Sequence, residues 1–259
     1  MDKQLVIIAG FCGGIGKAFF NYYMRQPSTE CIGIGRKCEP SKNQIALDLA
    51  DEEKAREIIT NMDLEKYTKA VYLHGIGIDL FEPDGRPEMD YDQDGIDDRI
   101  YESNVQTLMN AAKPLMRMVA EKNKRLTLCA IGSISDHFKV PLWQSFSRSK
   151  DIVRTFFKST SNQYLNNVMI NVSSVLCDDN KYARKFADTT HWLKPEQIIE
   201  ISTPILDRDL KAKYIEFDIF NPSPDYRQDY FTNIPRLFEQ WRQDMGYAKG
   251  ERIPHGLRI

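Results

Sequence analysis

The sequence predicts a single α/β domain built around a doubly wound parallel sheet, and two observations lead to this fold class. Residues 5–9 form an unbroken apolar run, typical of a strand buried on both faces, and a glycine-rich turn follows it directly. Apolar strands and helices then alternate to about residue 220, an order that gives parallel strands joined by right-handed crossovers. Because no Pro/Gly/Ser-rich linker divides the chain, we expect one domain over residues 1–221 and a C-terminal extension over 222–259.

The glycine-rich turn predicts a dinucleotide site of the Rossmann type. Gly10 permits the tight turn, Gly14 lets the backbone approach a pyrophosphate, and Gly16 lets the next helix, expected at 17–25, pack close to the sheet. The first amides of that helix point at the phosphates. The residues of this turn expected to contact the cofactor are Gly10, Cys12, Gly13, Gly14, Ile15 and Gly16.

The ends of the second and third expected strands indicate which dinucleotide binds. Arg36 and Lys37 follow the second strand, 31–35, where an NAD site places an acid for the ribose 2'-hydroxyl. Two cations suit a 2'-phosphate and favour NADP(H), with a solvated charge pair as the alternative. The third strand, 44–49, ends in Asp48 and Leu49, and an acid there can accept a hydrogen bond from the adenine amino group.

The remaining elements follow from apolar runs and from helix start and stop signals. We expect strands at 71–76, 126–131, 168–172 and 214–220, and helices at 51–62 and 147–166. Gly75, in the fourth strand, lies where a ligand can approach the backbone closely and is a further candidate cofactor contact.

Over about residues 3–220 the chain resembles the short-chain dehydrogenase/reductase family. The family's TGxxxGIG pattern appears as residues 9–16, with alanine for the threonine, and its NNAG stretch corresponds to residues 72–75, where the glycine is kept. The segment 98–105 resembles the family's asparagine-bearing helix and makes Asn104 the counterpart of that asparagine. Ser133 precedes Phe146 at the spacing with which the family's catalytic serine precedes its tyrosine.

The family's YxxxK motif corresponds to Phe146 and Lys150, so the lysine is kept and the tyrosine hydroxyl is missing. The resemblance implies that Ser133 hydrogen-bonds a substrate carbonyl, Lys150 holds the nicotinamide ribose, and Asn104 anchors a water that relays protons. Phe146 marks the position of the acid/base, but a phenyl ring can neither donate nor accept that proton.

We therefore expect an NADP(H)-dependent oxidoreductase that transfers a hydride between nicotinamide and a carbonyl or alcohol of a small molecule. Three explanations of Phe146 stay open: an engineered replacement, a natural reductase that takes its proton from water or from Tyr101, His74 or His137, and a non-catalytic NADP-binding scaffold. Reduction of an activated C=C bond would also tolerate a phenylalanine, since its proton can come from elsewhere.

The substrate side of the site is expected to involve a lid at about 177–195, a loop and helix over the cavity. The family's Pro-Gly pair before this lid is absent, because Ser173 and Ser174 stand there. His137 and Trp143 are candidate substrate contacts. The resemblance also implies a homodimer or homotetramer.

The C-terminal extension contains an expected helix that Asn233 caps. Its apolar stripe comprises Ile234, Leu237, Phe238, Trp241 and Met245. The stripe predicts either packing on the domain or a tail that crosses to a neighbouring subunit.

Composition limits the classes of partner. A net charge of −2 argues against nucleic acid and anionic membranes, so the partner is expected to be a small molecule. Five scattered cysteines without CxxC spacing predict no zinc site and no disulfide framework, which fits the cytoplasm. Residues 90–98 match the start of a calcium loop, but Tyr101 stands where its last ligand should be, so a calcium loop and a solvated acidic turn both stay open.

Overall fold

The computed structural model describes residues 3–82, 96–220 and 231–258. Seven parallel strands form one sheet in the order β3-β2-β1-β4-β6-β7-β8, so the chain winds outward in both directions from β1 and β4. This confirms the predicted doubly wound parallel sheet. The strands are β1 (Gln4–Ala9), β2 (Thr29–Gly35), β3 (Gln44–Ala46), β4 (Lys69–His74), β6 (Arg125–Ser133), β7 (Leu165–Val172) and β8 (Tyr214–Ile219).

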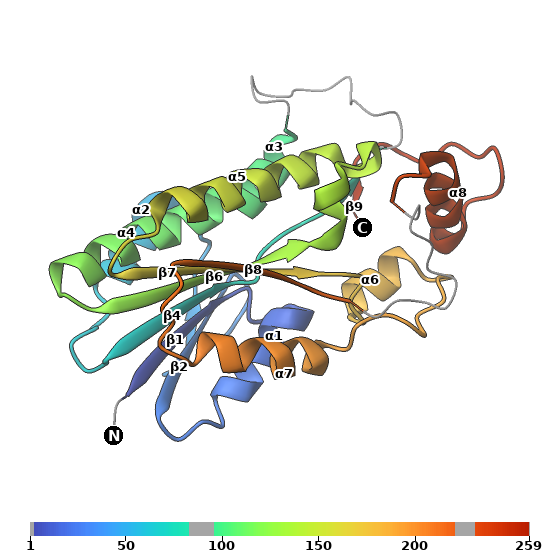
Figure 1. Cartoon of the computed structure of the whole chain (residues 1–259). Coiled ribbons are helices and arrows are strands. Elements are labelled where there is room, and N and C mark those ends of the chain that lie inside the picture. The colour runs from blue at the N-terminus through green and yellow to red at the C-terminus, as the bar shows by residue number, and fades with distance from the viewer. Residues whose placement is uncertain (1–2, 83–95, 221–230, 259) are drawn as a thin grey trace.

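Helices cover both faces of the sheet (Figure 1). On one face lie α2 (Glu52–Thr60), α4 (Thr107–Glu121) and α5 (Gln144–Thr160); on the other lie α1 (Gly14–Tyr23) and α7 (Pro195–Leu206). The alternation of side chains along β1 divides the core between these two layers, because Leu5 and Ile7 pack towards α2 and α4, and Val6 and Ile8 towards α1 and α7.

Several expected boundaries differ from the structure by a few residues: β4, for example, ends at His74, so Gly75 lies beyond the strand. Two others are the ends of α5 and β3. α5 ends at Thr160 rather than at Asn166, because Ser161 is extended and the Asn162 side chain accepts a hydrogen bond from the Tyr164 amide at 2.8 Å, which turns the chain into β7. β3 stops at Ala46, so Asp48 and Leu49 lie beyond the strand. Both differences arise from local turn geometry.

The C-terminal extension lies at the end of the sheet where the strands finish (Figure 1). It contains α8 (Ile234–Met245), with Asn233 as the N-cap, and β9 (Leu257–Arg258). The apolar stripe of α8 packs in one cluster with Phe81, Val140 and Trp143. β9 pairs antiparallel with β5 (Leu80–Phe81), a small sheet that the sequence did not predict.

Candidate functional site

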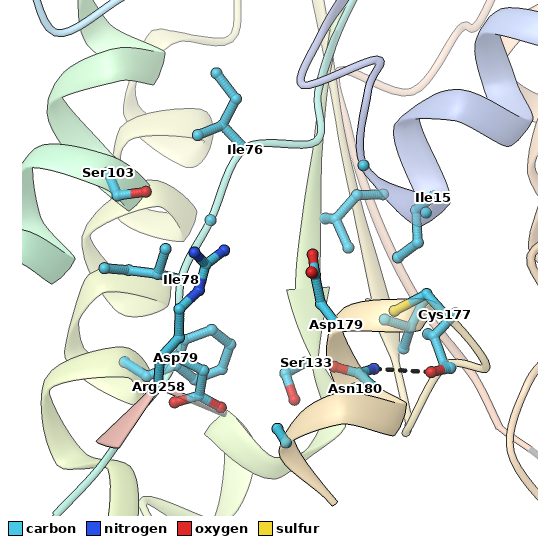
Figure 2. Close-up of a pocket in the computed structure, with 18 of the residues that line it drawn as sticks. Ile15, Ile76, Ile78, Asp79, Ser103, Ser133, Cys177, Asp179, Asn180 and Arg258 are labelled. Carbon is cyan, nitrogen blue, oxygen red and sulfur yellow. Dashed lines mark hydrogen bonds between the residues drawn. The ribbon is translucent and has the colours of Figure 1, made fainter. Parts of the chain in front are cut away.

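A cavity of about 1400 Å³ opens at the carboxyl ends of the strands. The segments that follow β1, β2, β4, β6 and β7 line it, together with parts of α8 and β9. Its volume exceeds that of an ordinary small-ligand pocket, which leaves room for a dinucleotide and a second molecule. Figure 2 shows Ile15 and Cys177 on one side of this space and Ile78 and Asp79 on the other.

At one end of the cavity, the glycine turn allows backbone segments to approach closely. Gly10 has φ +80°, and a Cβ there would lie 2.9 Å from the carbonyl of Gly75. A Cβ on Gly16 would lie 2.3 Å from the Gly10 oxygen. α1 begins at Gly14 with no side-chain cap and no acid in its first turn, so its first amides are available to an anion.

Next to this turn, two exposed cations line the cavity. Arg36 and Lys37 directly follow β2. Arg36 Nη1 lies 3.9 Å from Asp48 Oδ2, but the two side chains are 69% and 50% exposed, so this ion pair is weak and can be displaced. Leu49, beside Asp48, is buried and also lines the cavity.

Away from the glycine turn, Ser133 and Lys150 both line the cavity. Ser133 ends β6, and its Oγ lies 2.8 Å from Ser135 Oγ. Lys150 is buried, and its Nζ donates to the Ile131 carbonyl at 3.0 Å. Burial lowers the pKa of Lys150 to about 8 despite nearby carboxylates, so this ammonium gives up a proton more readily than an exposed lysine.

Phe146 lies one turn before Lys150 on α5 and lines the same cavity. The Lys150 ammonium is 5.0 Å from the centre of its ring, a cation–π contact. The predicted i, i+4 proximity of these side chains is therefore present, and the phenyl ring contributes no titratable group.

Asn104 does not line the cavity; it is buried in a π-helical turn, η1 (Glu102–Gln106). Its Oδ1 accepts from the Ile78 amide at 2.8 Å, and its Nδ2 donates to the Ile78 carbonyl at 3.0 Å and to Ser149 Oγ at 3.1 Å. The side chain thus holds the segment after β4 against α5.

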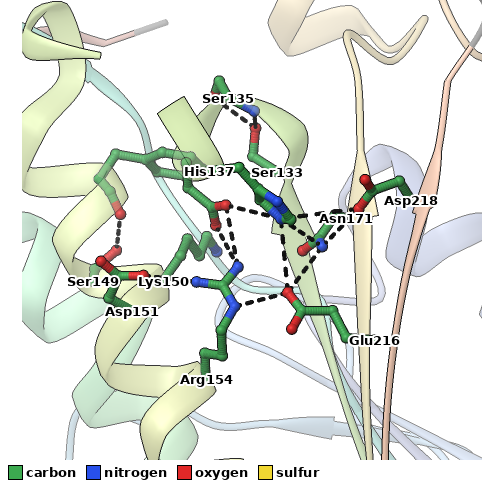
Figure 3. A network of polar contacts seen from close by, with 12 residues as sticks. Ser133, Ser135, His137, Ser149, Lys150, Asp151, Arg154, Asn171, Glu216 and Asp218 are labelled. Atoms are coloured by element: carbon green, nitrogen blue, oxygen red, sulfur yellow. Dashed lines mark hydrogen bonds and ion pairs between the residues drawn. The ribbon is translucent and has the colours of Figure 1, made fainter. Parts of the chain in front are cut away.

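Of the two expected substrate contacts, the structure brings Trp143 to the cavity and leaves His137 outside its lining. Figure 3 shows His137 in a polar network with side chains of β7 and β8, where Asn171 Nδ2 lies 3.0 Å from its Nε2. Arg154 binds Asp136 and Glu216 in the same network. These contacts hold the His137 ring away from the site, which corrects the expectation from sequence.

His74 and Tyr101, the other two side chains considered as proton donors, do not line the cavity either. His74 is buried, and its ring nitrogens lie 3.0 Å from the Tyr72 hydroxyl and 3.3 Å from Thr107 Oγ1. Burial lowers the pKa of His74 to about 3, so the imidazole is neutral at pH 7. Tyr101 packs against the apolar core.

The expected lid contains α6 (Asp178–Ala183) and is tied to both ends of the site. A Cβ on Gly14 would lie 2.5 Å from that of Cys177, so the start of the lid packs against the glycine turn. Arg184 forms an ion pair with Asp244 of α8 and lies over the Trp241 ring, 4.1 Å from its centre. The lid and the C-terminal extension therefore form one wall of the cavity.

The charged cavity residues that sequence reasoning missed include Asp79 and Arg258. Asp79 lies after β4 in the segment 75–80. An acid this close to Gly75, where a ligand was expected to approach the backbone, could have marked it as a candidate site residue. Arg258 reaches the cavity because β9 pairs with β5, and no local sequence pattern predicts that pairing.

The acidic run 90–98 lies mostly outside the described residues. Within them, Asp97 caps the short helix α3 (Asp98–Tyr101) and forms an ion pair with Arg99 at 2.7 Å. No group of three or more His, Cys, Asp or Glu side chains is placed to hold a metal ion in the described ranges. Across the same ranges, every helix is too short or too polar to cross a membrane.

Comparisons with known proteins found similarity in structure. No protein-family model and no curated protein sequence matches the chain. A short-chain dehydrogenase from Salmonella enterica serovar Typhi is similar at 17% identity over 84% of this chain and 96% of that chain, with a TM-score of 0.69. The aldohexose dehydrogenase of Thermoplasma acidophilum is 14% identical over 84% of this chain and 93% of its own, with a TM-score of 0.67.

A third similar structure is ElxO with NADP bound, which is 14% identical over 84% of this chain and 98% of that chain, with a TM-score of 0.65. Identities this low establish the fold alone. The chain has the fold of the short-chain dehydrogenases.

Proposed function

We propose that this protein is an NADP(H)-dependent oxidoreductase that moves a hydride between nicotinamide and a carbonyl or alcohol of a small molecule. One observation supports this most directly: a single cavity brings together the glycine turn, the Arg36–Lys37 pair, and Ser133 with Lys150. The two ends of this cavity match the two ends of a dinucleotide, with cations at one and polar groups suited to a carbonyl at the other.

The glycine turn fits the cofactor's phosphates. Gly10 and Gly16 leave no space for a Cβ, and the uncapped start of α1 offers backbone amides to a pyrophosphate. Arg36 and Lys37 would bind a 2'-phosphate, and Asp48 and Leu49 would border the adenine. When bound, the reduced cofactor supplies the hydride.

At the reaction end, Ser133 would donate its hydroxyl proton in a hydrogen bond to the substrate oxygen. Lys150 would hold the nicotinamide ribose, which its buried position beside Ile131 allows. Asn104 would act as a positioning residue through Ile78. Trp143 would border the substrate.

The phenylalanine at position 146 is compatible with cofactor binding. ElxO was also solved as a tyrosine-to-phenylalanine variant with NADPH bound, so a protein of this fold holds the dinucleotide after such a change. The missing hydroxyl therefore bears on proton transfer and leaves the binding proposal intact.

Calorimetric titration with NADPH and, separately, with NADH tests this function. We expect NADPH to bind at least about tenfold more tightly, because its 2'-phosphate gains charge-assisted hydrogen bonds from two cations. Equal affinities would overturn the NADP(H) preference. Absence of binding by both dinucleotides would overturn the proposal and favour an interaction protein that keeps the sheet alone.

A further inference from the structure

The carboxyl group of Asp79 occupies an unusual position in the cavity. The residue lies in the segment between β4 and β5, and Figure 2 shows its side chain projecting into the space that Ser133 also lines. Its Oδ1 is buried without a hydrogen-bond partner. Buried polar atoms in folded proteins nearly always have a partner, so an orphaned oxygen in a ligand cavity indicates a group that meets a ligand.

The surroundings of Asp79 favour its neutral, protonated form. Burial raises the pKa of this carboxyl group well above its usual range, and the Lys150 ammonium opposes burial with a smaller effect. The negative charge of Glu82 raises the pKa further, and a backbone hydrogen bond from Leu80 lowers it. A protonated carboxylic acid is a hydrogen-bond donor as well as an acceptor. Asp79 is thus protonated more readily than an exposed aspartate, and it lies near enough to Lys150 for the two charges to interact.

The other carboxylates of the cavity differ from Asp79. Those that are exposed to solvent are Asp48, Asp98, Glu102, Asp179 and Asp188. Asp244 is buried but forms an ion pair with Arg184. Among the carboxylates that line the cavity in the described ranges, Asp79 alone has a buried oxygen without a hydrogen-bond partner.

We propose that Asp79 is the general acid and base of this site, in place of the tyrosine hydroxyl that Phe146 lacks; this inference rests on the proposed oxidoreductase function. In the reductive direction the carbonyl carbon accepts the hydride from NADPH, and the π electron pair moves to the oxygen. That oxygen takes the proton of Asp79, which leaves an alcohol, NADP⁺ and an Asp79 carboxylate. Lys150 stabilises this carboxylate until solvent returns the proton.

The Asp79→Asn variant tests the proposal, because the amide keeps the size of the side chain and removes its acidic proton. We expect reduction of the probe 4-nitrobenzaldehyde, followed as NADPH oxidation, to fall about 100-fold, the usual size of a lost acid–base group. NADPH binding in calorimetry should stay within about threefold. Asp209→Asn, which removes an exposed carboxylate after α7 and outside the cavity lining, is the matched control and should leave both unchanged.

Two further readouts separate proton transfer from a structural role. Infrared spectra at neutral pH should show the carbonyl band of a protonated carboxylic acid that disappears in Asp79→Asn. Adding Phe146→Tyr to the Asp79→Asn variant should restore turnover, because a phenol then stands beside Lys150.

The outcomes distinguish the two proposals. If the parent protein binds NADPH but lacks the infrared band, or if Asp79→Asn keeps full turnover, Asp79 is not the acid and the oxidoreductase function stands. If the parent protein binds no dinucleotide, the function itself fails and the role of Asp79 fails with it.

Discussion

The two ends of the cavity are formed by different parts of the chain, one by main-chain atoms and the other by side chains. At the cofactor end, main-chain atoms make the site: Gly10, Gly16 and Gly75 bring backbone segments together, and helix amides face the open space. At the reaction end, side chains from distant segments make it, with Lys150 from α5 and Arg258 from β9. The first end is a local structure within one strand-turn-helix unit, and the second depends on the folding of the whole chain.

This difference separates binding from chemistry. A backbone site offers the same amides to any dinucleotide, so it can persist while the reacting groups change. The side chains at the other end come from separate elements, so one of them can change without the others.

The largest expected effect is a loss of stability from a substitution in α8, which forms part of the cavity lining. Leu237 of α8 is 1% exposed and lies in the cluster with Phe81 and Trp143. Leu237→Ala should lower the free energy of unfolding by about 2–5 kcal/mol, because it removes buried apolar contacts and leaves a cavity. Chemical denaturation measures this loss, and NADPH affinity should stay the same below the unfolding transition.

Ile201→Ala is the control for this change. Ile201 lies on α7 and is 48% exposed, so its truncation should alter stability by less than about 0.5 kcal/mol. Equal losses of unfolding free energy in the two variants would mean that α8 does not pack into the hydrophobic core. The cavity end that contains Lys150 would then not depend on the folding of the C-terminal extension.

The cofactor half of the fold was predictable because its signals are local. The order of strands, the glycine turn and the positions of Arg36 and Lys37 follow from short apolar runs and their spacing, and the structure shows the expected parallel sheet. A buried strand cannot be mistaken for a surface loop when five apolar residues follow one another.

The reaction end was predictable only in part. The spacing of Ser133, Phe146 and Lys150 placed all three on the cavity, because β6 and α5 are neighbours in the chain. Asp79 became significant through burial, and Arg258 through a pairing between residues that are distant in the sequence. His137 lies elsewhere because Asn171, on β7, holds its ring. Burial and long-range pairing are properties of the folded chain, so no short sequence pattern contains them.

An intermediate effect is expected at the glycine turn. Gly16→Ala places a Cβ 2.3 Å from the Gly10 oxygen, so the turn must move and the helix amides move with it. Strain of this kind costs about 1–3 kcal/mol, and NADPH should bind about ten- to a hundredfold more weakly in calorimetry. Gly250→Ala is the control: with φ +82° and nothing within 4 Å of the added Cβ, it strains the backbone outside the cavity lining and should leave the affinity unaltered. An unchanged affinity in Gly16→Ala would show that the backbone does not make this end of the site.

The smallest expected effect is on NADPH affinity and tests whether the Arg36 side chain contributes to binding in addition to the backbone amides. Arg36→Ala removes a cation beside the expected 2'-phosphate, so NADPH should bind about five- to tenfold more weakly while NADH affinity stays the same. Arg25→Ala, which removes an exposed cation just after α1 and away from the cavity, controls for net charge. The difference between the two variants should shrink as salt is added, because Arg36 is 69% exposed and its charge is screened. If Arg36→Ala weakens both dinucleotides equally, the arginine acts on the shared phosphates, and the preference for NADP(H) must come from Lys37.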